Sequence, residues 1–405
     1  MKIAFCSLIL PEDKNLTALT KGEQSGIALS KVCDSLLRGF DENGIDVTAF
    51  NIINTLNYPK IPKVYFKTEK WEHNKMSNDY HIGYINIFGI KYITQARNLY
   101  RGLSTWIKKN KDHSIVCIYF PFYPSIKAVY KIKKKYKDKV KVCFITGDIY
   151  GSDASDFIRE RDLKQKIHYF FEKRMNQMIR FFDYYAFATE AMAPAIGVEK
   201  KPNTIVECLY KVPDKRLPVI EEESSCKTIF YAGGIRLEYG IKHLIESFKL
   251  IQDNHYKLII AGHGKDKNYV EQASLLDSRI EYIGQIPPEK VYEYQQKATV
   301  LINPRISGDY EFVKYTFPSK TVDCLAAGKP YIAHRLAGIP IEYDDYIQYP
   351  EDESNEALAN KIIEICNLEK EVREKIGQKG KDFIYREKNA KVMTQKIIDM
   401  IERNI

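Results

Sequence analysis

The sequence predicts an α/β protein with two doubly wound domains, each built on a parallel β-sheet. Short apolar runs alternate with longer amphipathic segments along most of the chain, which is typical of parallel strands joined by helices. The length of 405 residues exceeds what one core usually takes. Hydrophobic residues make up 44% and charged residues 28%, a globular balance that argues against long disorder, collagen and coiled coil.

The first half contains five short apolar runs that are predicted to be buried strands. They are residues 3–8, 46–53, 114–120, 139–146 and 184–189. The third run ends at Pro121 and is apolar almost throughout, as expected for a parallel strand covered on both faces. Segments 26–40, 125–135 and 156–180 are predicted to be helices because their apolar residues recur at helical spacing. Residues 54–81 show little periodicity and are expected to form a loop or an excursion.

The second half repeats this pattern. Strands are predicted at residues 227–232, 256–261, 280–283, 299–303 and 330–333, helices at 240–250, 288–297 and 319–327, and a last helix at 388–403. No run of about 18 apolar residues is present, so no transmembrane helix is expected. The apolar start of the chain meets Pro11 and lacks a small-x-small cleavage site. We therefore interpret it as a first strand rather than a signal peptide.

The halves meet in a polar segment near residues 212–225, which contains Pro213, Pro218 and a run of glutamates, as linkers do. We expect an N-terminal domain at 1–215, a linker at 216–226, a C-terminal domain at 227–387 and a final helix at 388–405. The net charge of +9 is unevenly shared. Residues 1–215 hold 35 Lys and Arg against 23 Asp and Glu, whereas the rest holds 27 against 30. The basic half either meets an anionic partner or only adds solubility.

Cysteine and histidine positions argue against disulfide and metal chemistry. The eight cysteines are scattered, without a C-x-x-C pair, and most lie in apolar strand-like runs. We expect reduced, buried thiols in a cytoplasmic protein. The histidines do not show the spacing of metal ligands, so no metal ion is expected.

A glycine-rich turn follows the first strand of the second half. Gly233 and Gly234 allow the backbone to approach a ligand closely, and Arg236 adds positive charge. The start of the next helix supplies N–H groups suited to phosphate. Gly262, His263 and Gly264 follow the next strand in a similar way. The dinucleotide fingerprint G-x-G-x-x-G is absent at both places, so a plain tight turn remains the alternative.

A second cluster follows the strand at 299–303 and is the stronger signal. It comprises Pro304, Arg305, Phe317, Pro318, Ser319, Lys320 and Asp323. Ser319 is a suitable helix N-cap, and the N–H groups of that helix suit an anion together with Arg305 and Lys320. Asp323, one turn further, suits a ribose diol rather than a phosphate. The cluster predicts a nucleoside-diphosphate clamp; the alternative is a helix cap with a solvated lysine and a surface ion pair.

Seven short motifs of the second half resemble those of a known protein family. The motifs are YAGG, YGIKHLIESF, LIIAGHG, IEYIG, NPR, FPSK and LAAGKPYIAHRLAGIP, within residues 227–343. They resemble glycosyltransferase family 4 and, within it, the bacterial surface-polysaccharide branch with the Phe-Pro-Ser-Lys variant. The resemblance implies a GT-B fold, with two Rossmann-like domains facing a cleft and the C-terminal one holding a nucleotide sugar. It also implies retention of anomeric configuration without a metal ion, and a final helix that packs back on the N-terminal domain.

The family's acidic motif, E-x7-E, is altered here. Its second Glu, which binds the ribose, matches Asp323, which keeps the carboxylate on a shorter side chain. Its first Glu matches Tyr315, and Glu311, four residues earlier, is the candidate substitute. The family's nucleobase often stacks near the strand that contains Ile283 in this chain.

The family's positively charged phosphate ligands are altered as well. They match Gly234 and Tyr239, which carry no charge, so Arg236, Arg305 and Lys320 are the available replacements. Such cations would stabilise the negative charge that builds on a sugar-diphosphate leaving group. Without an obvious acid pair, retention is expected to proceed by front-face attack, with a leaving phosphate oxygen accepting the proton of the acceptor.

In the first half the resemblance covers only the architecture. The family commonly uses a glycine loop after its first strand and a polar residue after its fourth. Ser25, Gly26 and Asp148 are the nearest candidates on the acceptor side. The catalytic histidine of many members has no clear counterpart. We therefore expect Glu311, Asp148 and Lys320 to be the catalytic residues.

A basic segment runs from Lys127 to Lys141 and holds eight lysines against one acid, Asp138, with tyrosines interleaved. It suits an anionic membrane surface and a lipid-diphosphate acceptor, because basic residues near such a surface are attracted to it. A solvated helix face is the equal alternative. No nucleic-acid-binding module is recognisable, so nucleic acid is not expected as a partner.

The sequence as a whole predicts a retaining glycosyltransferase that uses a nucleotide sugar, with UDP-sugar favoured over GDP-sugar. The expected acceptor is a glycan or lipid-linked molecule in bacterial surface polysaccharide synthesis, such as capsule or O-antigen. We expect a cytoplasmic protein, at the inner membrane face, with no cofactor because the donor is a substrate. The alternatives are a GT-B sugar epimerase or inverting transferase, and a non-catalytic protein that binds a nucleotide sugar or a polyanion.

Overall fold

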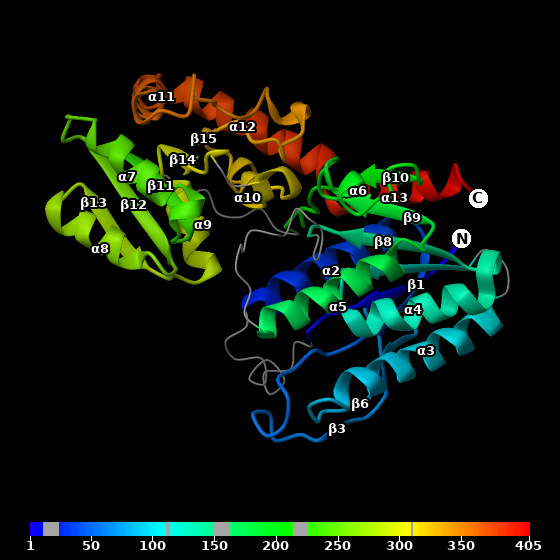
Figure 1. Cartoon of the computed structure of the whole chain (residues 1–405). Coiled ribbons are helices and arrows are strands. Elements are labelled where there is room, and N and C mark those ends of the chain that lie inside the picture. The colour runs from blue at the N-terminus through cyan, green and yellow to red at the C-terminus, as the bar shows by residue number, and fades with distance from the viewer. Residues whose placement is uncertain (11–23, 111–113, 149–162, 214–225, 309–310) are drawn as a thin grey trace. The chain divides into compact units, whose positions relative to one another are not determined.

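The computed structural model describes residues 1–10, 24–110, 114–148, 163–213, 226–308 and 311–405. The chain divides into two compact units (Figure 1). One joins Met1–Lys211 with Asn389–Ile405, and the other is Val212–Lys388. Each unit is a mainly parallel sheet with helices on both faces, so the predicted doubly wound α/β fold is confirmed.

The first unit contains an eight-stranded sheet in the order β10-β9-β8-β7-β1-β2-β5-β4. Its strands are β1 (Lys2–Ser7), β2 (Asp46–Asn51), β4 (Glu69–Trp71), β5 (Asp79–His81), β7 (Ser114–Tyr119), β8 (Lys141–Thr146), β9 (Tyr184–Phe187) and β10 (Asn203–Ile205). All neighbours are parallel except β4 and β5. The central strands β1, β7 and β8 are almost entirely buried, which explains why their sequences are continuous apolar runs.

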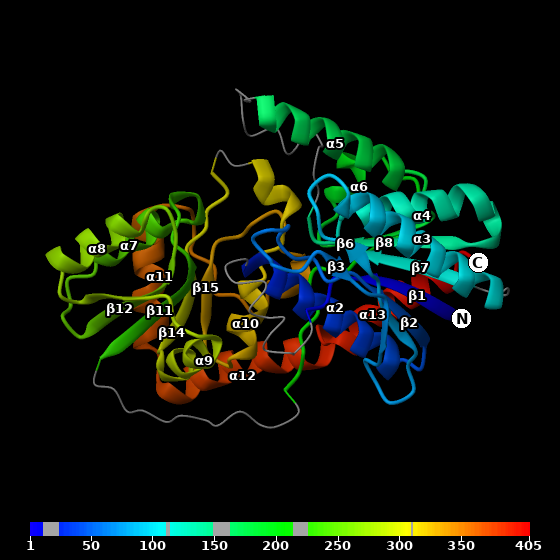
Figure 2. The same cartoon turned by 90° about the horizontal axis from the view of Figure 1, so that it is seen from below.

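Two groups of helices cover this sheet (Figures 1 and 2). On one face, α2 (Gln24–Glu42) and α13 (Ala390–Glu402) share an apolar core with the strands. On the other face lie α3 (Lys91–Lys109), α4 (Tyr123–Tyr136) and α5 (Leu163–Ile179). Two short helices complete the unit, η1 (Lys137–Lys139) and α6 (Met192–Ala195).

The last helix, α13, completes the first unit although it comes after the whole of the second. A Cβ atom at Gly39 of α2 would lie 2.4 Å from the carbonyl oxygen of Ala390, so only glycine permits this approach. Asn43 then donates a hydrogen bond to Thr394 Oγ1 at 2.9 Å. The expectation that the final helix packs on the N-terminal domain is confirmed.

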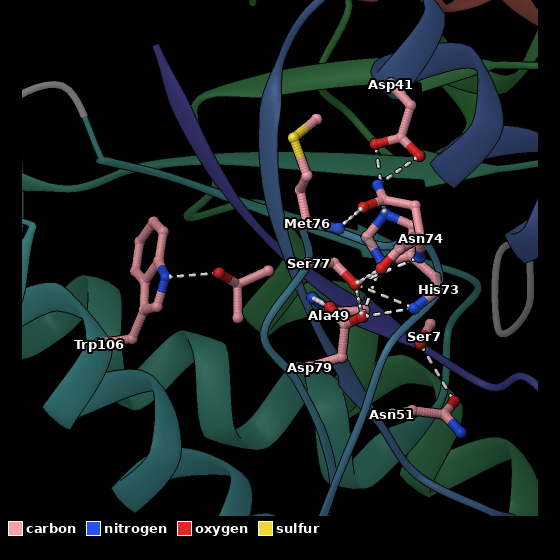
Figure 3. Close-up of polar contacts among 11 residues, drawn as sticks. Ser7, Asp41, Ala49, Asn51, His73, Asn74, Met76, Ser77, Asp79 and Trp106 are labelled. Carbon is pink, nitrogen blue, oxygen red and sulfur yellow. Dashed lines mark hydrogen bonds and ion pairs between the residues drawn. The ribbon is translucent and has the colours of Figure 1, made fainter.

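Residues 54–81 form the expected excursion, but it is not without structure. It contributes β3 (Tyr65–Phe66), which pairs with β6 (Tyr84–Ile85), and it adds β4 and β5 to the sheet edge. A polar cluster fixes it to β2 (Figure 3). The buried Asp79 carboxylate accepts hydrogen bonds from the Ala49 N–H at 2.6 Å and from the Ser77 hydroxyl at 2.6 Å.

His73 joins two carboxylates in the same cluster (Figure 3). Its Nδ1 lies 2.7 Å from Asp79 Oδ2 and its Nε2 lies 3.2 Å from Asp41 Oδ1. Burial alone would lower the pKa of His73, but the hydrogen bonds to Asp41 and Asp79 raise it to about 9. His73 is therefore a protonated group held between two acids at neutral pH.

The second unit contains a five-stranded parallel sheet in the order β13-β12-β11-β14-β15. The strands are β11 (Lys227–Gly234), β12 (Tyr256–His263), β13 (Ile280–Gly284), β14 (Val300–Asn303) and β15 (Tyr331–Ala333). One face shares an apolar core with α7 (Ile241–Lys249), α8 (Lys267–Leu276) and α11 (Asn355–Asn367). The remaining helices are α9 (Pro288–Lys297), α10 (Lys320–Ala326) and α12 (Lys370–Glu387), with the short η3 (Leu237–Tyr239), η4 (Glu311–Tyr315) and η5 (Ile341–Tyr343).

The order of the strands identifies one edge of each sheet as the place for a ligand. In the first sheet β1 lies between β2 and β7, and in the second β11 lies between β12 and β14. Connections leave toward opposite faces at such a point, which opens a crevice outside the carboxyl ends of the strands. Among the described residues, no helix is both long and apolar enough to cross a bilayer.

Candidate functional site

The site in the second unit is built on the carboxyl ends of β11 and β12. Both strands are longer than predicted, so Gly233, Gly234, Gly262 and His263 are their last residues rather than turn residues. Gly262 has a φ of +141°, and a Cβ atom there would lie 1.8 Å from the carbonyl oxygen of Gly233. The glycine therefore allows the two strand ends to run side by side.

Lys320 lies directly against the end of β11. A Cβ atom at Gly233 would lie 1.5 Å from Lys320 Nζ, so the glycine leaves the space that the ammonium group occupies. The same nitrogen lies 3.5 Å from the Tyr231 hydroxyl and 4.7 Å from the centre of the Tyr231 ring. Burial lowers the pKa of Lys320 to about 8, and the positive charge of Arg305 acts in the same direction.

Two arginines share one aromatic ring at the same edge. The guanidinium carbon of Arg305 lies 5.5 Å from the centre of the Tyr239 ring, and that of Arg236 lies 5.9 Å from it. Arg305 is buried and its Nη2 donates to Thr316 Oγ1 at 3.4 Å. Desolvation holds the pKa of Arg305 below its usual value. Two cations thus lie within cation–π distance of the Tyr239 ring.

The structure therefore brings together the three predicted phosphate ligands, Arg236, Arg305 and Lys320. They come from the loop after β11, the loop after β14 and the start of α10, the segments that flank the change in strand order. Two of the three cations, Arg305 and Lys320, are partly desolvated, and this desolvation lowers their pKa values. An anion bound here would compensate for the hydration that these two cations lose on burial.

The helix that follows differs from the expectation. Ser319 stands at the N-cap position of α10, but its backbone is already helical (φ −51°, ψ −26°) and its side chain makes no capping hydrogen bond. The N-cap role predicted for Ser319 is wrong, since a capping residue needs an extended backbone. Asp323 is exposed one turn later, and its charge raises the pKa of Lys320 against the effect of burial.

The remaining donor-side residues line the rim of the same edge. His263 is exposed at the end of β12 and Ile283 is partly buried at the end of β13. Tyr282, next to Ile283, donates its hydroxyl to the carbonyl oxygen of Gly262 at 2.9 Å. Gly264 begins the loop after β12.

Pro304 and Pro318 are buried next to the cation cluster, and Phe317 is partly buried. The ring of Phe317 lies 5.4 Å from the ring of Tyr343 in η5. These apolar residues shape the loops that carry Arg305 and Lys320, rather than presenting polar groups of their own.

The predicted acceptor-side residues lie in the first unit. Ser25 and Gly26 belong to the first turn of α2, and their side chains lie outside the described residues. Asp148 follows β8 and is exposed, and its N–H donates to Thr146 Oγ1 at 3.1 Å. Glu311 begins η4 in the second unit, and its side chain also lies outside the described residues.

A histidine pair at the carboxyl end of β15 was not predicted. His334 follows β15 directly and is buried, and its Nε2 lies 2.9 Å from His243 Nε2. His243 Nδ1 lies 2.7 Å from Asn355 Oδ1. Burial lowers the pKa of His334 to about 4, so both rings exchange hydrogen bonds as neutral groups. The sequence could have indicated His334 as a candidate site residue, because it stands immediately after a predicted strand, where ligand-binding residues collect.

Metal binding has no support in the part of the chain that the structure describes. There, no three His, Cys, Asp or Glu side chains are grouped so that they could hold a metal ion. Six of the eight cysteines are buried. Desolvation raises the pKa of Cys324, next to the cation cluster, to about 12, so that thiol is not a nucleophile at neutral pH.

Comparisons with known proteins agree with this geometry. Residues 215–383 match the family model described as glycosyl transferases group 1. No curated protein matches the sequence. Among solved structures, the chain is similar to sucrose-phosphate synthase from Thermosynechococcus elongatus, with 14% identity and a TM-score of 0.64 over 100% of this chain and 99% of that chain.

Two further structures show the same similarity over the full length. The apo form of the lipopolysaccharide outer core galactosyltransferase WaaB has 14% identity and a TM-score of 0.61, with 100% of both chains covered. An E. coli structure described as trehalose-6-phosphate bound with UDP-2-fluoro glucose has 9% identity and a TM-score of 0.61, again with 100% of both chains covered. At these identities the similarity shows the fold alone, and that fold is GT-B.

The match to the family model lies entirely within the second unit, which contains the glycine-lined strand ends and the three cations. Residues 215–383 match the glycosyl transferases group 1 model, and the chain is a glycosyltransferase with the GT-B fold.

Proposed function

We propose that the chain transfers a sugar, with retention of anomeric configuration, from a nucleoside-diphosphate sugar to a glycan or lipid-linked acceptor in bacterial surface polysaccharide synthesis. The observation that carries the proposal is the convergence of Arg236, Arg305 and Lys320 on the carboxyl edge at β11 and β14. UDP-sugar is favoured over GDP-sugar, because one structure of the same fold is bound with UDP-2-fluoro glucose.

The cations suit the charge that develops during transfer. The bond between the anomeric carbon and the diphosphate oxygen breaks, and the acceptor oxygen bonds to the anomeric carbon from the same face. The acceptor's proton passes to the departing phosphate oxygen, so no nucleophile of the enzyme is needed. Groups already placed and desolvated, such as Lys320 and Arg305, stabilise the leaving diphosphate without reorganising.

We propose roles in sugar transfer for the other predicted residues as well. We assign the ribose to Asp323 and the nucleobase to the rim at Ile283. Glu311 and Asp148 are proposed as catalytic groups, and Ser25 with Gly26 as acceptor-side ligands.

Neither a cofactor nor a metal ion is proposed, so turnover is expected to be the same before and after treatment with EDTA, measured as release of free UDP. A loss of turnover that Mg²⁺ or Mn²⁺ restores would contradict the metal-free model.

The donor site is tested by removing its cations one at a time. Lys320→Met keeps the side-chain stem and removes the charge, and Arg305→Ala removes the second cation. Each is expected to weaken UDP binding about tenfold or more, because a hydrogen bond to a charged group contributes about 1.5–3 kcal/mol. Isothermal titration with UDP, GDP and CMP measures this. Lys257→Ala is the matched control, because the ion pair of Lys257 with Glu281 is exposed at the surface.

The outcome also separates the alternatives. Equal affinity of all three variants for UDP would contradict the donor-site assignment. Isomerised nucleotide sugar without transfer would indicate an epimerase, and an inverted product would indicate an inverting transferase. The altered positions Gly234, Tyr239 and Tyr315 favour a binding protein as the second candidate. That candidate would be correct if UDP bound tightly but no sugar moved to any acceptor, including water.

We also propose that the protein works in the cytoplasm, at the inner face of the membrane. The basic segment from Lys127 to Lys141 supports this location through its charge alone.

A further inference from the structure

The basic segment forms one wall of a groove between α3 and α4. The two helices pack side by side in both views (Figures 1 and 2). The groove has a volume of about 730 Å³. Its lining includes the cations Arg97 and Arg101 of α3 and Lys127, Lys131, Lys134 and Lys135 of α4. Neither α3 nor α4 contains an Asp or a Glu.

The structure changes which residues belong to the basic patch that was predicted at Lys127 to Lys141. Lys133 does not belong to it, because its Nζ forms an ion pair with Asp183 at 2.8 Å and its side chain is largely buried. Arg97 and Arg101 were not expected and replace it, because α3 itself was not predicted. Six cations therefore face one groove with no acidic residue among its lining side chains.

Aromatic rings hold several of these lysines at the surface. Lys127 Nζ lies 5.4 Å from the centre of the Tyr123 ring, and Lys134 Nζ lies 5.1 Å from that of Tyr130. Such contacts keep the ammonium groups in place without neutralising their charge. The cations therefore remain available to a negatively charged partner.

Large apolar side chains are exposed just before and at the start of α3, the helix that forms one wall of the groove. Phe88 is 82% exposed, Ile93 is 61% exposed and Tyr92 is 52% exposed. Ile93 also lines the basic groove. Tyr92 lines a second cavity of about 460 Å³, whose walls include Phe120, Phe122, Tyr123 and Phe171. Large apolar side chains exposed within one short segment, one of which lines the basic groove, indicate an interaction surface.

We propose that this surface, the α3–α4 face, docks on a membrane that contains anionic lipids. Phe88, Tyr92 and Ile93 enter the interface between headgroups and acyl chains, and the six cations bind lipid phosphates. A dissolved polyanion would satisfy the cations but would leave Phe88 and Ile93 in water. A bilayer surface satisfies both halves of the patch at once, which decides between the two partners. The inference deepens the proposed function, since it fits a lipid-linked acceptor, but docking itself needs no turnover.

Vesicle flotation tests the proposal with the full chain. The probe is phosphatidylcholine vesicles with and without 30% phosphatidylglycerol, at about 0.1 M and 0.5 M salt. Wild type is expected to float with the anionic vesicles at low salt and to be released at high salt. Lys131→Gln/Lys134→Gln is expected to lower the partition constant about 25-fold, because each cation near an anionic surface contributes about fivefold. Lys70→Gln/Lys391→Gln, which removes the same charge elsewhere in the first unit, is the control.

The apolar half needs its own variant. Phe88→Ser/Ile93→Ser changes only exposed side chains and is expected to reduce flotation at low salt by at least tenfold. Wild-type behaviour of this variant would overturn the proposal and indicate binding of a dissolved polyanion. Failure of the wild type to float with anionic vesicles would overturn it as well. Lys320→Met should float like wild type, so loss of donor binding and loss of docking are distinguishable.

Discussion

At the scale of single residues, the donor site depends on contacts that distant positions make with one another. Lys320 and Gly233 lie in different motifs, yet the ammonium group occupies the place where a side chain at position 233 would begin. Sequence reasoning selected Gly233 because it follows a predicted strand, and Lys320 because it stands at the start of a predicted helix. It could not show that they touch, because this depends on β14 pairing beside β11.

His73 allows a prediction about stability against pH. Its folded pKa of about 9 lies above the unfolded value of about 6.5. Its contribution is therefore fully present below pH 6.5 and is lost as the pH rises through 9. Urea unfolding of wild type and His73→Asn between pH 6 and 10 is expected to show a difference that shrinks with rising pH. A difference that stays constant over this range would mean that His73 is not charged in the folded protein.

At the scale of elements, most of the sheet was predictable from the sequence. All predicted strands are present. They could be recognised because parallel strands buried on both faces appear in the sequence as continuous apolar runs. The helices α3, α8, α11 and α12 were not predicted. In α3 the buried residues Ala96, Leu99, Leu103 and Trp106 recur at helical spacing, but many basic and polar residues surround them. Two of the exposed cations that dilute this signal, Arg97 and Arg101, belong to the α3–α4 face.

The docking of α13 on α2 gives a prediction at the same scale. A side chain at Gly39 would collide with the backbone of Ala390, which a rotamer change cannot relieve. Gly39→Leu is expected to displace α13 and to destabilise the first unit by about 1–3 kcal/mol, as overpacking does. Gly44→Ala is a partial control, since nothing lies within 4 Å of the added carbon and only the backbone conformation is strained. An unchanged unfolding midpoint for Gly39→Leu would contradict the close packing.

At the scale of the whole molecule, the uneven charge follows the two units. The first unit carries the cations of the α3–α4 face, whereas in the second unit Arg236, Arg305 and Lys320 gather at the end of the sheet. Sequence alone does not distinguish a cation suited to a small bound anion from one suited to an extended anionic surface. Burial separates them, because Lys320 and Arg305 are desolvated, whereas Lys131, Lys134 and Lys135 are exposed.

The two cores predict how the molecule unfolds. Each unit has its own apolar core, so calorimetry is expected to show two transitions rather than one. UDP at about 100 times its Kd should stabilise the unit that binds it by about 2.7 kcal/mol. This raises the midpoint of that transition by roughly 5–10 °C for a unit of this size. Gly39→Leu should lower the other transition and leave the shift caused by UDP unchanged. If UDP raised the transition that Gly39→Leu lowers, the nucleotide would bind to the first unit, and the assignment of the donor to Arg236, Arg305 and Lys320 would be wrong.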